Sequence, residues 1–447
     1  MSDPLDTSTL EDRARQLVDK ARAAGADAAD AVVVRSVSQS ADARLGKIEE
    51  MQRSESDDLS LRVFVGKQVA SVSGNDFAAM DQIVDRALAM ARVAPEDPFA
   101  GLLDAADLVD EKADLDLLDR DQPSGEALAE RALETETIML EQKGVTNSGG
   151  ASAGWGVGGM VLATSGGFSG TYLGSRFSLS ATAIAGEGTG MERDYDFSSA
   201  VYEADLDAPE TIGKRAAERA VARLGARKIE STRGAVVFAP RCARSLLGHL
   251  AGAINGASIA RGTSFLKDRL SERVFGEGIF IHDDPERRRG LRSRPFDGEG
   301  ARCGALTLVA DGVLQTWLLD GASARELGLK TNGRAMRSGS TSRPGTTNLS
   351  LAPGSESPEA LVGGVQRGLY VTDLIGHGVN LVTGDYSRGA AGFWIEDGQL
   401  REPVAEVTIA GNLTDIFARM VPANDFKYRF GTDAPTVLVE DMTIAGR

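Results

Sequence analysis

The chain has 447 residues, of which 42% are hydrophobic and 26% are charged. This length predicts two or three domains whose cores need no disulfide bonds, and the composition excludes a largely disordered chain. Lys and Arg number 49 against 65 Asp and Glu, which gives a net charge of −16. Because so negative a surface repels phosphate backbones and anionic lipids, it disfavours direct nucleic-acid or membrane partners.

Targeting and redox features predict a soluble protein of the cytoplasm. No apolar run reaches the about 18 residues of a membrane span, and the first residues lack the basic start of a secretory signal. Only two cysteines occur, Cys242 and Cys303, and neither lies in a metal-binding or redox motif. We interpret them as small buried hydrophobic residues in a reducing compartment rather than as ligands.

Residues 1–95 are predicted to form an N-terminal segment of mixed helix and strand. Apolar residues recur at helical spacing over 10–21 and stop before Gly25, a natural helix end. The remaining patterns predict a strand over 31–37, a hairpin of strands 59–65 and 69–73, and a helix over 77–88 that ends before Pro95.

Residues 96–123 are predicted to be an acidic connection, either a linker or a solvated stretch, because residues 96–122 carry ten Asp and Glu. Residues 124–230 are predicted to be a Gly-rich strand and helix segment that completes the N-terminal half. Within it we expect a helix capped by Ser124, short antiparallel strands over 155–190, and a helix that opens at Pro209.

Residues 231–447 are predicted to be a β-rich C-terminal domain. It should begin with a buried strand over 234–240 and a helix that contains Leu246 and Leu250. The later patterns predict hairpins 304–309 with 312–318 and 393–396 with 404–409, a helix over 359–369 and a strand over 436–444. The predicted fold class is α+β, with a mixed α/β N-terminal half that has antiparallel strands and a β-rich, antiparallel C-terminal half.

Histidine is scarce, and the three histidines are far apart in the sequence. His249 lies on the predicted helix after residue 240, without the second imidazole and the glutamate that a metallopeptidase helix needs to bind zinc and activate water. A lone histidine on an apolar helix is more often a hydrogen-bonded core residue than a ligand. His377 lies in a Gly-flanked turn and has no partner at ligand spacing.

One further segment combines histidine with acidic and basic residues. His282, Asp283 and Asp284 could suggest an oxygen-rich metal site, but Pro285 and the charges that follow are typical of a solvated loop. Five arginines lie between positions 287 and 294 without interleaved aromatic residues. In so acidic a chain, this basic patch is expected to meet an acidic surface or a peptide carboxylate rather than DNA.

Motifs for other chemistries are absent from the sequence. There is no G-x-S-x-G nucleophile elbow with a convincing His and acid partner, no phosphate loop and no dinucleotide fingerprint. The residues alone therefore indicate a multi-domain α+β protein without a self-sufficient active site.

Long strings of the sequence nonetheless resemble a known family. They are residues 190–196 (GMERDYD), 256–268 (GASIARGTSFLKD), 378–396, 403–413 (PVAEVTIAGNL) and 441–446 (DMTIAG). Together they resemble the TldD/PmbA family, and within it the PmbA (TldE) branch, over nearly the whole chain.

The resemblance implies a heterodimer in which a TldD-type partner holds zinc through a His-Glu-x-x-x-His helix and a cysteine near its C-terminus. A PmbA-type subunit then completes a chamber that encloses small or unfolded peptides for proteolysis or processing. The family also carries an older description as a modulator of DNA gyrase.

The resemblance places the metal helix on His249, with Leu250 at the glutamate position and Ile254 at the second histidine. Residues 430–433 stand where the partner type has its cysteine. Only the first ligand remains, so we expect no catalytic residue, metal or other cofactor in this chain. One imidazole gives zinc too few ligands, and the water would lack its general base.

The segment 383–392 is a candidate for a wall that lies near the peptide or the partner. We expect Asp385, Tyr386, Ser387 and Arg388 to be exposed there between two glycines. The alternative is a tight β connection whose polar residues hydrogen-bond their own backbone.

Three functions are compatible with these observations. The leading hypothesis is the non-metal subunit of a TldD/TldE-type metallopeptidase, which needs a TldD-type partner and which could form a homodimer when alone. The others are a self-sufficient metallopeptidase homodimer that uses His249, and a regulatory binding protein that acts on DNA gyrase.

Overall fold

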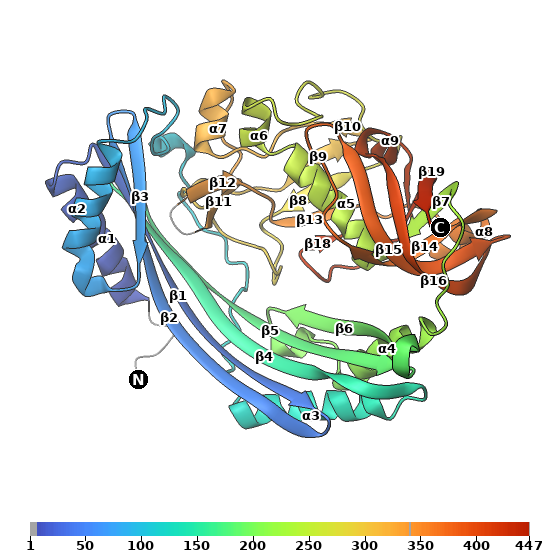
Figure 1. The fold of residues 1–447 in the computed structure, drawn as a ribbon. Helices are drawn as coiled ribbons and strands as arrows, with labels where there is room; N and C mark the ends of the chain where they lie inside the picture. Colours follow the sequence, from blue (N-terminus) through green and yellow to red (C-terminus); the bar gives the residue numbers. More distant parts are fainter. Residues whose placement is uncertain (1–6, 339–340, 447) are drawn as a thin grey trace.

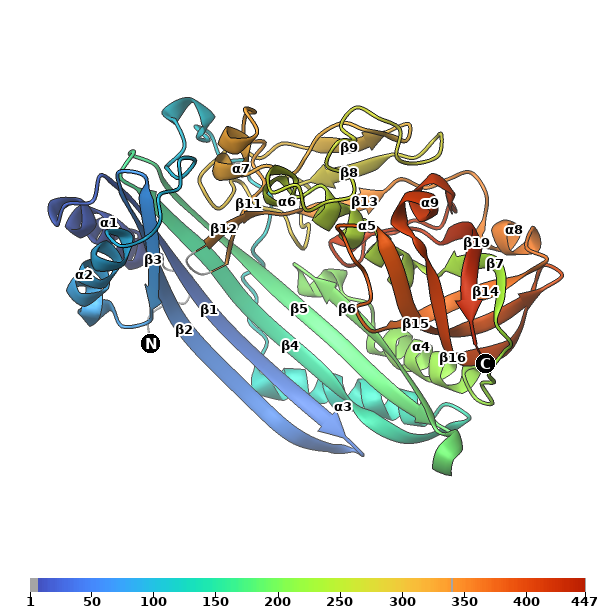
Figure 2. The same cartoon turned by 45° about the horizontal axis from the view of Figure 1, so that its top comes forward.

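The computed structural model describes residues 7–338 and 341–446. A long, curved sheet with helices on its outer face forms the N-terminal half, and a rounder β-rich body faces the inner side of this sheet (Figure 1). The same arrangement is visible after rotation, with the C-terminal body above β5 and β6 (Figure 2). The predicted α+β class is confirmed.

The N-terminal sheet is a six-stranded antiparallel sheet in the order β3-β2-β1-β4-β5-β6. Its strands are β1 Ala28–Arg44, β2 Lys47–Val65, β3 Gln68–Gly74, β4 Val145–Thr164, β5 Ser169–Ala185 and β6 Glu192–Ala200. The prediction of short strands over 155–190 is wrong, because β4 and β5 run for 20 and 17 residues. The glycines lie within the strands. At Gly159 a Cβ atom would come within 2.6 Å of the Tyr172 carbonyl oxygen.

Four helices cover one face of this sheet. They are α1 Ser8–Ala23, α2 Met80–Ala91, α3 Gly125–Leu140 and α4 Pro209–Ala222. Alternate residues of β1 point toward them, with Ala31 and Val33 beneath α1 and α2, and Val37 and Ala41 beneath α3 and α4. The predicted cap of α3 is confirmed, since the Ser124 hydroxyl accepts a hydrogen bond from the Ala127 N–H.

The acidic connection crosses between the two halves instead of lying free in solvent. The Val109 N–H donates to the Gly300 carbonyl, and the Ser175 N–H donates to the Leu117 carbonyl. Leu115 is buried. The prediction of a linker or solvated stretch is therefore wrong for the middle of this segment, because its isolated apolar residues and its backbone contact both halves.

The C-terminal body is built on a mixed sheet in the order β16-β15-β14-β7-β19-β17. Its strands are β7 Thr232–Phe238, β14 Arg367–Ile375, β15 Asp385–Glu396, β16 Gln399–Asn412, β17 Met420–Pro422 and β19 Val437–Ala445. Residues 408–410 of β16 also pair with residues 443–445 of β19, so five of these strands close into a barrel. Strand β7 is parallel to β14, a pairing that the sequence did not predict.

Smaller sheets and five helices complete this body. One sheet contains β10 Val313–Leu314, β9 Leu306–Ala310, β8 Ile281–Asp284, β13 Asn348–Leu351 and β18 Thr432–Asp433, and a hairpin is formed by β11 Ala335–Ser338 and β12 Thr341–Pro344. The helices are α5 Pro240–Ala253, α6 Gly256–Ala260, α7 Gly321–Glu326, α8 Pro358–Gly363 and α9 Leu413–Ala418. Among residues 7–338 and 341–446, no helix has the length and apolar character that a bilayer crossing requires.

The predicted helix over 359–369 is wrong in its second half. Helix α8 ends at Gly363, and β14 begins at Arg367. Leu361, Val362, Val365 and Leu369 fit a helical spacing, but Gly363 and Gly364 end the helix, and Leu369 is buried in the barrel.

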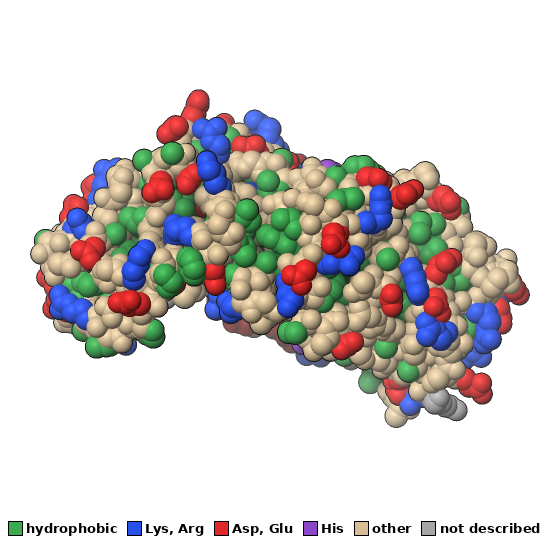
Figure 3. Space-filling view, turned by 90° about the horizontal axis from the view of Figure 1, so that it is seen from above, with side chains coloured by type: hydrophobic (Ala, Val, Ile, Leu, Met, Phe, Trp, Pro, Cys, Tyr) green, Lys and Arg blue, Asp and Glu red, His purple; other side chains and the backbone are tan. Residues whose placement is uncertain are grey.

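From above, the surface carries acidic and basic side chains intermixed rather than in separate patches (Figure 3).

The segment of His282, Asp283 and Asp284 is strand β8 and not the predicted solvated loop. Asp283 and Arg334 are both fully buried, and the Arg334 Nε atom lies 2.6 Å from an Asp283 carboxylate oxygen. The Asp283 carboxylate also accepts hydrogen bonds from the N–H and the hydroxyl of Thr347. This buried pair joins β8 to the segments that precede β11 and β13.

Replacement of Asp283 should strongly destabilise the protein. Asp283→Ala leaves the buried guanidinium of Arg334 without its counter-charge, which typically costs about 3–5 kcal/mol. Asp284→Ala is the matched control, because Asp284 is only half-buried and caps the N–H of Glu286, and it should cost about 1 kcal/mol or less. Unfolding in urea measures both; equal losses for the two variants would contradict this account.

Candidate functional site

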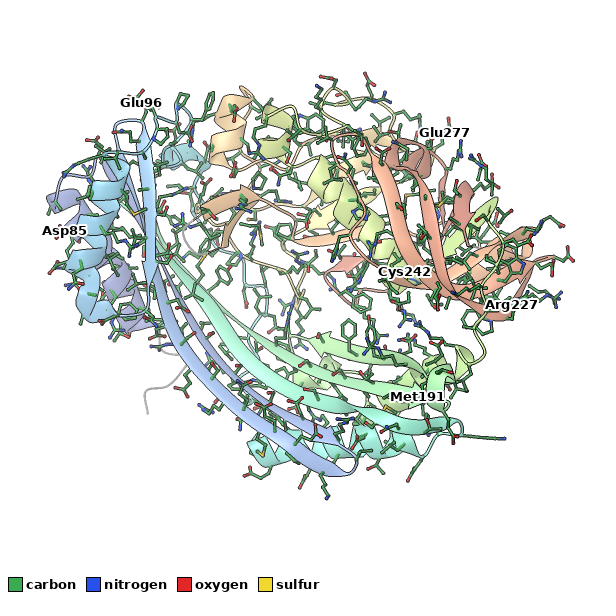
Figure 4. All side chains as sticks on the ribbon, viewed as in Figure 1. Asp85, Glu96, Met191, Arg227, Cys242 and Glu277 are labelled. Atoms are coloured by element: carbon green, nitrogen blue, oxygen red, sulfur yellow. The ribbon has the colours of Figure 1, made fainter. Side chains whose placement is uncertain are left out.

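Helix α5 holds the predicted metal position, and its packing fixes where the other side chains lie. It begins with Pro240 directly after β7, which suits the first position of a helix. Its buried residues are Cys242, Ala243, Leu246, Leu247, Leu250 and Ala253. They hold α5 in the core of the C-terminal body. Figure 4 places Cys242, in the first turn of α5, on the side of this body that faces β6.

His249 lies in an apolar and positively charged environment. Its ring meets the Tyr386 ring edge to face, with 5.9 Å between centroids. Its Nε2 atom and the Tyr386 hydroxyl are both buried and have no hydrogen-bond partner among the described residues. Burial, together with the nearby Arg388, lowers the pKa of His249 to about 4. The prediction of a hydrogen-bonded core histidine therefore differs from the structure: the imidazole is half-buried at the side of the core, and its buried Nε2 is unpaired.

The side chains around His249 do not fit a zinc ion. Leu250 and Ile254 are fully buried in the apolar core. Over residues 7–338 and 341–446, no three His, Cys, Asp or Glu side chains are grouped closely enough to hold a metal. Cys242 lies seven residues earlier on α5, and burial raises the pKa of its thiol to about 12, so it is not a thiolate at neutral pH. The charge of Arg388 would also repel a cation.

Residues 430–433, where the resemblance places the partner type's cysteine, form a bend followed by the two-residue strand β18. The Asp433 carboxylate accepts hydrogen bonds from the backbone N–H groups of Arg429, Phe430 and Gly431 at 2.7–3.1 Å. Both oxygens of this carboxylate are therefore hydrogen-bonded to the backbone of residues 429–431. Both cysteines, Cys242 and Cys303, are buried, as predicted.

A cavity of about 440 Å³ lies beside α5 and between the two halves. Its walls come from β6, α5, β14 and β15, from the segment between β8 and β9 that contains Arg292, and from residues 430–432. The charged and aromatic residues that line it are Tyr195, Arg241, Arg244, Arg292, Asp373, Arg388 and Phe430. Four arginines thus face one acidic residue in the cavity of a protein whose net charge is −16. We refer to this cavity as the arginine cavity.

One wall of the arginine cavity is fixed by a buried ion pair between the halves. Two nitrogens of Arg241 on α5 donate to the two carboxylate oxygens of Asp194 on β6, at 2.6 and 2.7 Å. Asp194 is 3% exposed. Burial alone would raise the pKa of Asp194, but the hydrogen bonds and charge of Arg241 hold it below its ordinary value. Both groups therefore remain charged at neutral pH.

A second buried carboxylate of β6 extends this contact. Asp196 is 2% exposed and lies 2.8 Å from Arg219 of α4 and 3.0 Å from Arg429 of the C-terminal segment. The same two arginines also donate to the backbone carbonyls of Tyr195 and Phe197. These carbonyls lie on the open edge of β6, so arginine side chains occupy part of this edge.

The predicted wall residues lie at the start of strand β15 and not in a turn. Tyr386 is 1% exposed, so its predicted exposure is wrong; its ring packs into the core beside His249. Asp385 is exposed and accepts a hydrogen bond from Thr383, and the Ser387 N–H donates to the Gly378 carbonyl. Of the four residues, only Arg388 lines the arginine cavity.

The remaining sequence candidates do not join this site as a group. His377 is exposed, and His282 Nδ1 lies 3.3 Å from the Thr307 hydroxyl. In the basic patch of residues 287–294, Arg288 and Arg289 form ion pairs with Asp116 of the acidic connection. An acidic surface of the same chain thus meets part of the patch, while Arg292 lines the arginine cavity.

Sequence reasoning missed Arg241 and Arg244, although a signal was present. Both arginines lie in the first turns of α5, where the helix dipole disfavours positive charge. No acidic residue lies in the first turn of this helix to compensate. Basic side chains at an unfavourable helix end indicate an external partner, which for Arg241 is Asp194.

Comparison with known proteins is consistent with this architecture. Sequence models described as PmbA/TldA metallopeptidase domain 1, central domain and C-terminal domain match residues 29–91, 119–224 and 231–446. Metalloprotease PmbA of Escherichia coli O157:H7 is 37% identical over 94% of this chain and 93% of its own length. A Haemophilus influenzae PmbA homologue is 35% identical over 96% and 94%. The chain belongs to the PmbA/TldD metallopeptidase family, which confirms the predicted PmbA resemblance.

Solved structures share the same fold. A Bacteroides thetaiotaomicron protein described as a candidate modulator of DNA gyrase has a TM-score of 0.90 at 26% identity and covers 99% of this chain and 100% of its own. TldE from Thermococcus kodakarensis has a TM-score of 0.85 at 20% identity, with 97% and 100% covered. The second likeness concerns the fold alone.

The low pKa of His249 should make folding pH-dependent. Between the ordinary pKa of histidine near 6.5 and about 4, the unfolded chain binds a proton that the folded protein does not, so stability falls with falling pH. Between pH 7 and pH 5, the free energy of unfolding should therefore fall by about 1–2 kcal/mol less in His249→Gln than in the unaltered protein. Urea unfolding of both proteins at the two pH values measures this difference.

His377→Gln is the matched control, because it removes an exposed imidazole. This variant should keep the pH dependence of the unaltered protein. An unchanged pH dependence in His249→Gln would contradict the assignment of the effect to the buried ring.

Proposed function

We propose that this chain is the non-metal, TldE-like subunit of a heterodimeric TldD/TldE-type metallopeptidase that degrades or processes small or unfolded peptides. The observation that carries the proposal is that Leu250 and Ile254 are buried where the resemblance expects metal-binding chemistry, beside a neutral His249 and the positive Arg388. A peptidase of this family needs a metal, and this donor set is unsuited to one. In this proposal the zinc belongs to the TldD-type partner.

Within such a complex, the chain contributes walls and binding contacts. The arginine cavity opens between the curved sheet and the C-terminal body, and β6 supplies one of its sides. Arg388 is the proposed wall residue that faces this space, whereas Asp385 and Ser387 lie on the exposed start of β15. Tyr386 supports the wall from the core.

The self-sufficient homodimer is less well supported by the same chemistry. It would need His249 to bind a metal, although the described part of the chain groups no further ligands and no general base around it. In the assembled complex, His249→Ala should therefore keep the peptidase activity of the unaltered complex within about twofold, as expected for a residue outside the reacting atoms. A loss of activity at equal complex content would instead favour the homodimer hypothesis.

The central test is reconstitution with the TldD-type protein from the same genome. The isolated chain should contain negligible zinc and cleave peptides negligibly, whereas the mixture should elute as a larger complex, contain zinc and cleave a small unfolded peptide. Size analysis, metal analysis and a fluorogenic peptide assay provide the three readouts. A partner variant that lacks the first histidine of its metal-binding helix is the matched control, and its complex should be inactive.

Two results would overturn the proposal. One is stoichiometric zinc, or peptidase activity, in the isolated chain. The other is a mixture that forms no complex and gains no activity.

A further inference from the structure

The charges in the arginine cavity are not balanced within the chain. Arg241 is neutralised by Asp194, and the single acidic residue of the cavity, Asp373, lies 3.3 Å from Arg223. Arg244, Arg292 and Arg388 line the cavity. Across residues 7–338 and 341–446, no carboxylate lies within ion-pair distance of any of these three guanidinium groups.

Neutral contacts hold these three side chains in place while leaving most of their donors available. The Arg244 guanidinium lies over the Phe430 ring, 4.3 Å from its centroid. Arg292 donates to the Thr432 hydroxyl at 3.2 Å, and Arg388 donates through Nε to the Ile375 carbonyl at 3.3 Å. Because a guanidinium carries five N–H donors, each of them can still bind an anion by two parallel hydrogen bonds.

Three like charges that line one cavity, none of them paired with a carboxylate, repel one another. In a chain with 65 acidic residues, four arginines against one aspartate in the cavity are a local reversal of the overall charge. The effect reaches the adjacent core, where Arg388 contributes to the low pKa of His249. A bound anion would relieve this repulsion.

The surroundings favour the carboxylate of a peptide over other anions. Tyr195 and Phe430 supply aromatic walls beside the guanidinium groups, where an apolar side chain could lie next to the charge. The volume of about 440 Å³ is within the range of small-ligand pockets. Arg219 and Arg429 already occupy two backbone carbonyls at the open edge of β6, so addition of a peptide strand is hindered there.

We propose that the arginine cavity is a carboxylate-binding pocket for peptides, in which Arg244, Arg292 and Arg388 bind the free C-terminal carboxylate. The proposal rests on the proposed peptide-handling function and specifies the substrate end that this chain recognises. In this role the site binds an anion, whereas a metal centre would bind a cation.

Binding of a defined peptide to the isolated full-length chain tests the pocket. The probe is a tetrapeptide with N-terminal fluorescein and a C-terminal phenylalanine, prepared as the free acid and as the amide. Fluorescence anisotropy should show the acid binding at least about tenfold more tightly than the amide. The amide lacks the negative charge that accepts paired hydrogen bonds from a guanidinium group. A third peptide, amidated but with a glutamate side chain, tests whether a side-chain carboxylate can substitute.

Variants locate the binding. Arg388→Met and Arg244→Met should each weaken binding of the free acid by about tenfold or more, whereas Arg388→Lys should weaken it less because the charge remains. Arg401→Met is the matched control, since Arg401 is exposed on β16 and lies outside the cavity. Thermal unfolding of each variant establishes that it remains folded.

Each outcome has a defined meaning. A preference for the free acid that is lost in the two methionine variants supports the pocket. Binding of the glutamate peptide also supports it and shows that a side-chain carboxylate can occupy the same pocket. Equal binding of acid and amide, unaltered binding in both methionine variants, or stronger binding of inorganic phosphate overturns it. Reconstitution with the TldD-type partner is scored separately, so failure of the pocket and failure of the proposed function are distinguishable.

Discussion

The arrangement of the two halves depends on buried ion pairs that are contributed by strand β6. Asp194 binds Arg241 of helix α5, and Asp196 binds Arg429 of the C-terminal segment. Two carboxylates that are almost inaccessible to solvent are stable only where charged donors meet them in good geometry. The curved sheet and the C-terminal body are therefore held in one relative position along β6, and this position creates the arginine cavity.

A second ionic contact restrains the other end of the same interface. Asp30 of β1 is 1% exposed and accepts hydrogen bonds from Arg62 of β2 and from Arg337 of β11. Burial raises the pKa of Asp30, but the two arginines hold it below its ordinary value. Two charged anchors far apart along the sheet oppose rotation of the halves more effectively than one. Apolar burial supplies most of the stability of each half, while these polar contacts specify how the halves meet.

The sequence predicted the elements whose signals are local. Helices α1 and α3 follow from apolar spacing and from the Ser124 cap, and the hairpin of β2 and β3 follows from alternation. Errors arose where one pattern had two structural solutions, as at Leu369, whose spacing fits a helix but whose side chain fills a barrel. The arginine cavity could not be predicted, because its walls come from separate parts of the chain between β6 and residue 432, which come together only in the tertiary structure. Resemblance identified the family, but it did not predict the positive charge around α5.

The proposed function and the arginine cavity are linked by electrostatics. A catalytic zinc site requires neutral imidazoles and anionic ligands that converge on a cation. Around α5 the described residues provide a neutral imidazole, no group of further metal ligands and several guanidinium groups, a charge set that suits an anion better than a cation. One site cannot serve both ions well, since each charge set repels the other ligand. In the proposed heterodimer, division between two subunits would resolve this conflict: the partner would hold the metal for hydrolysis, and this chain would hold a charged end of the peptide.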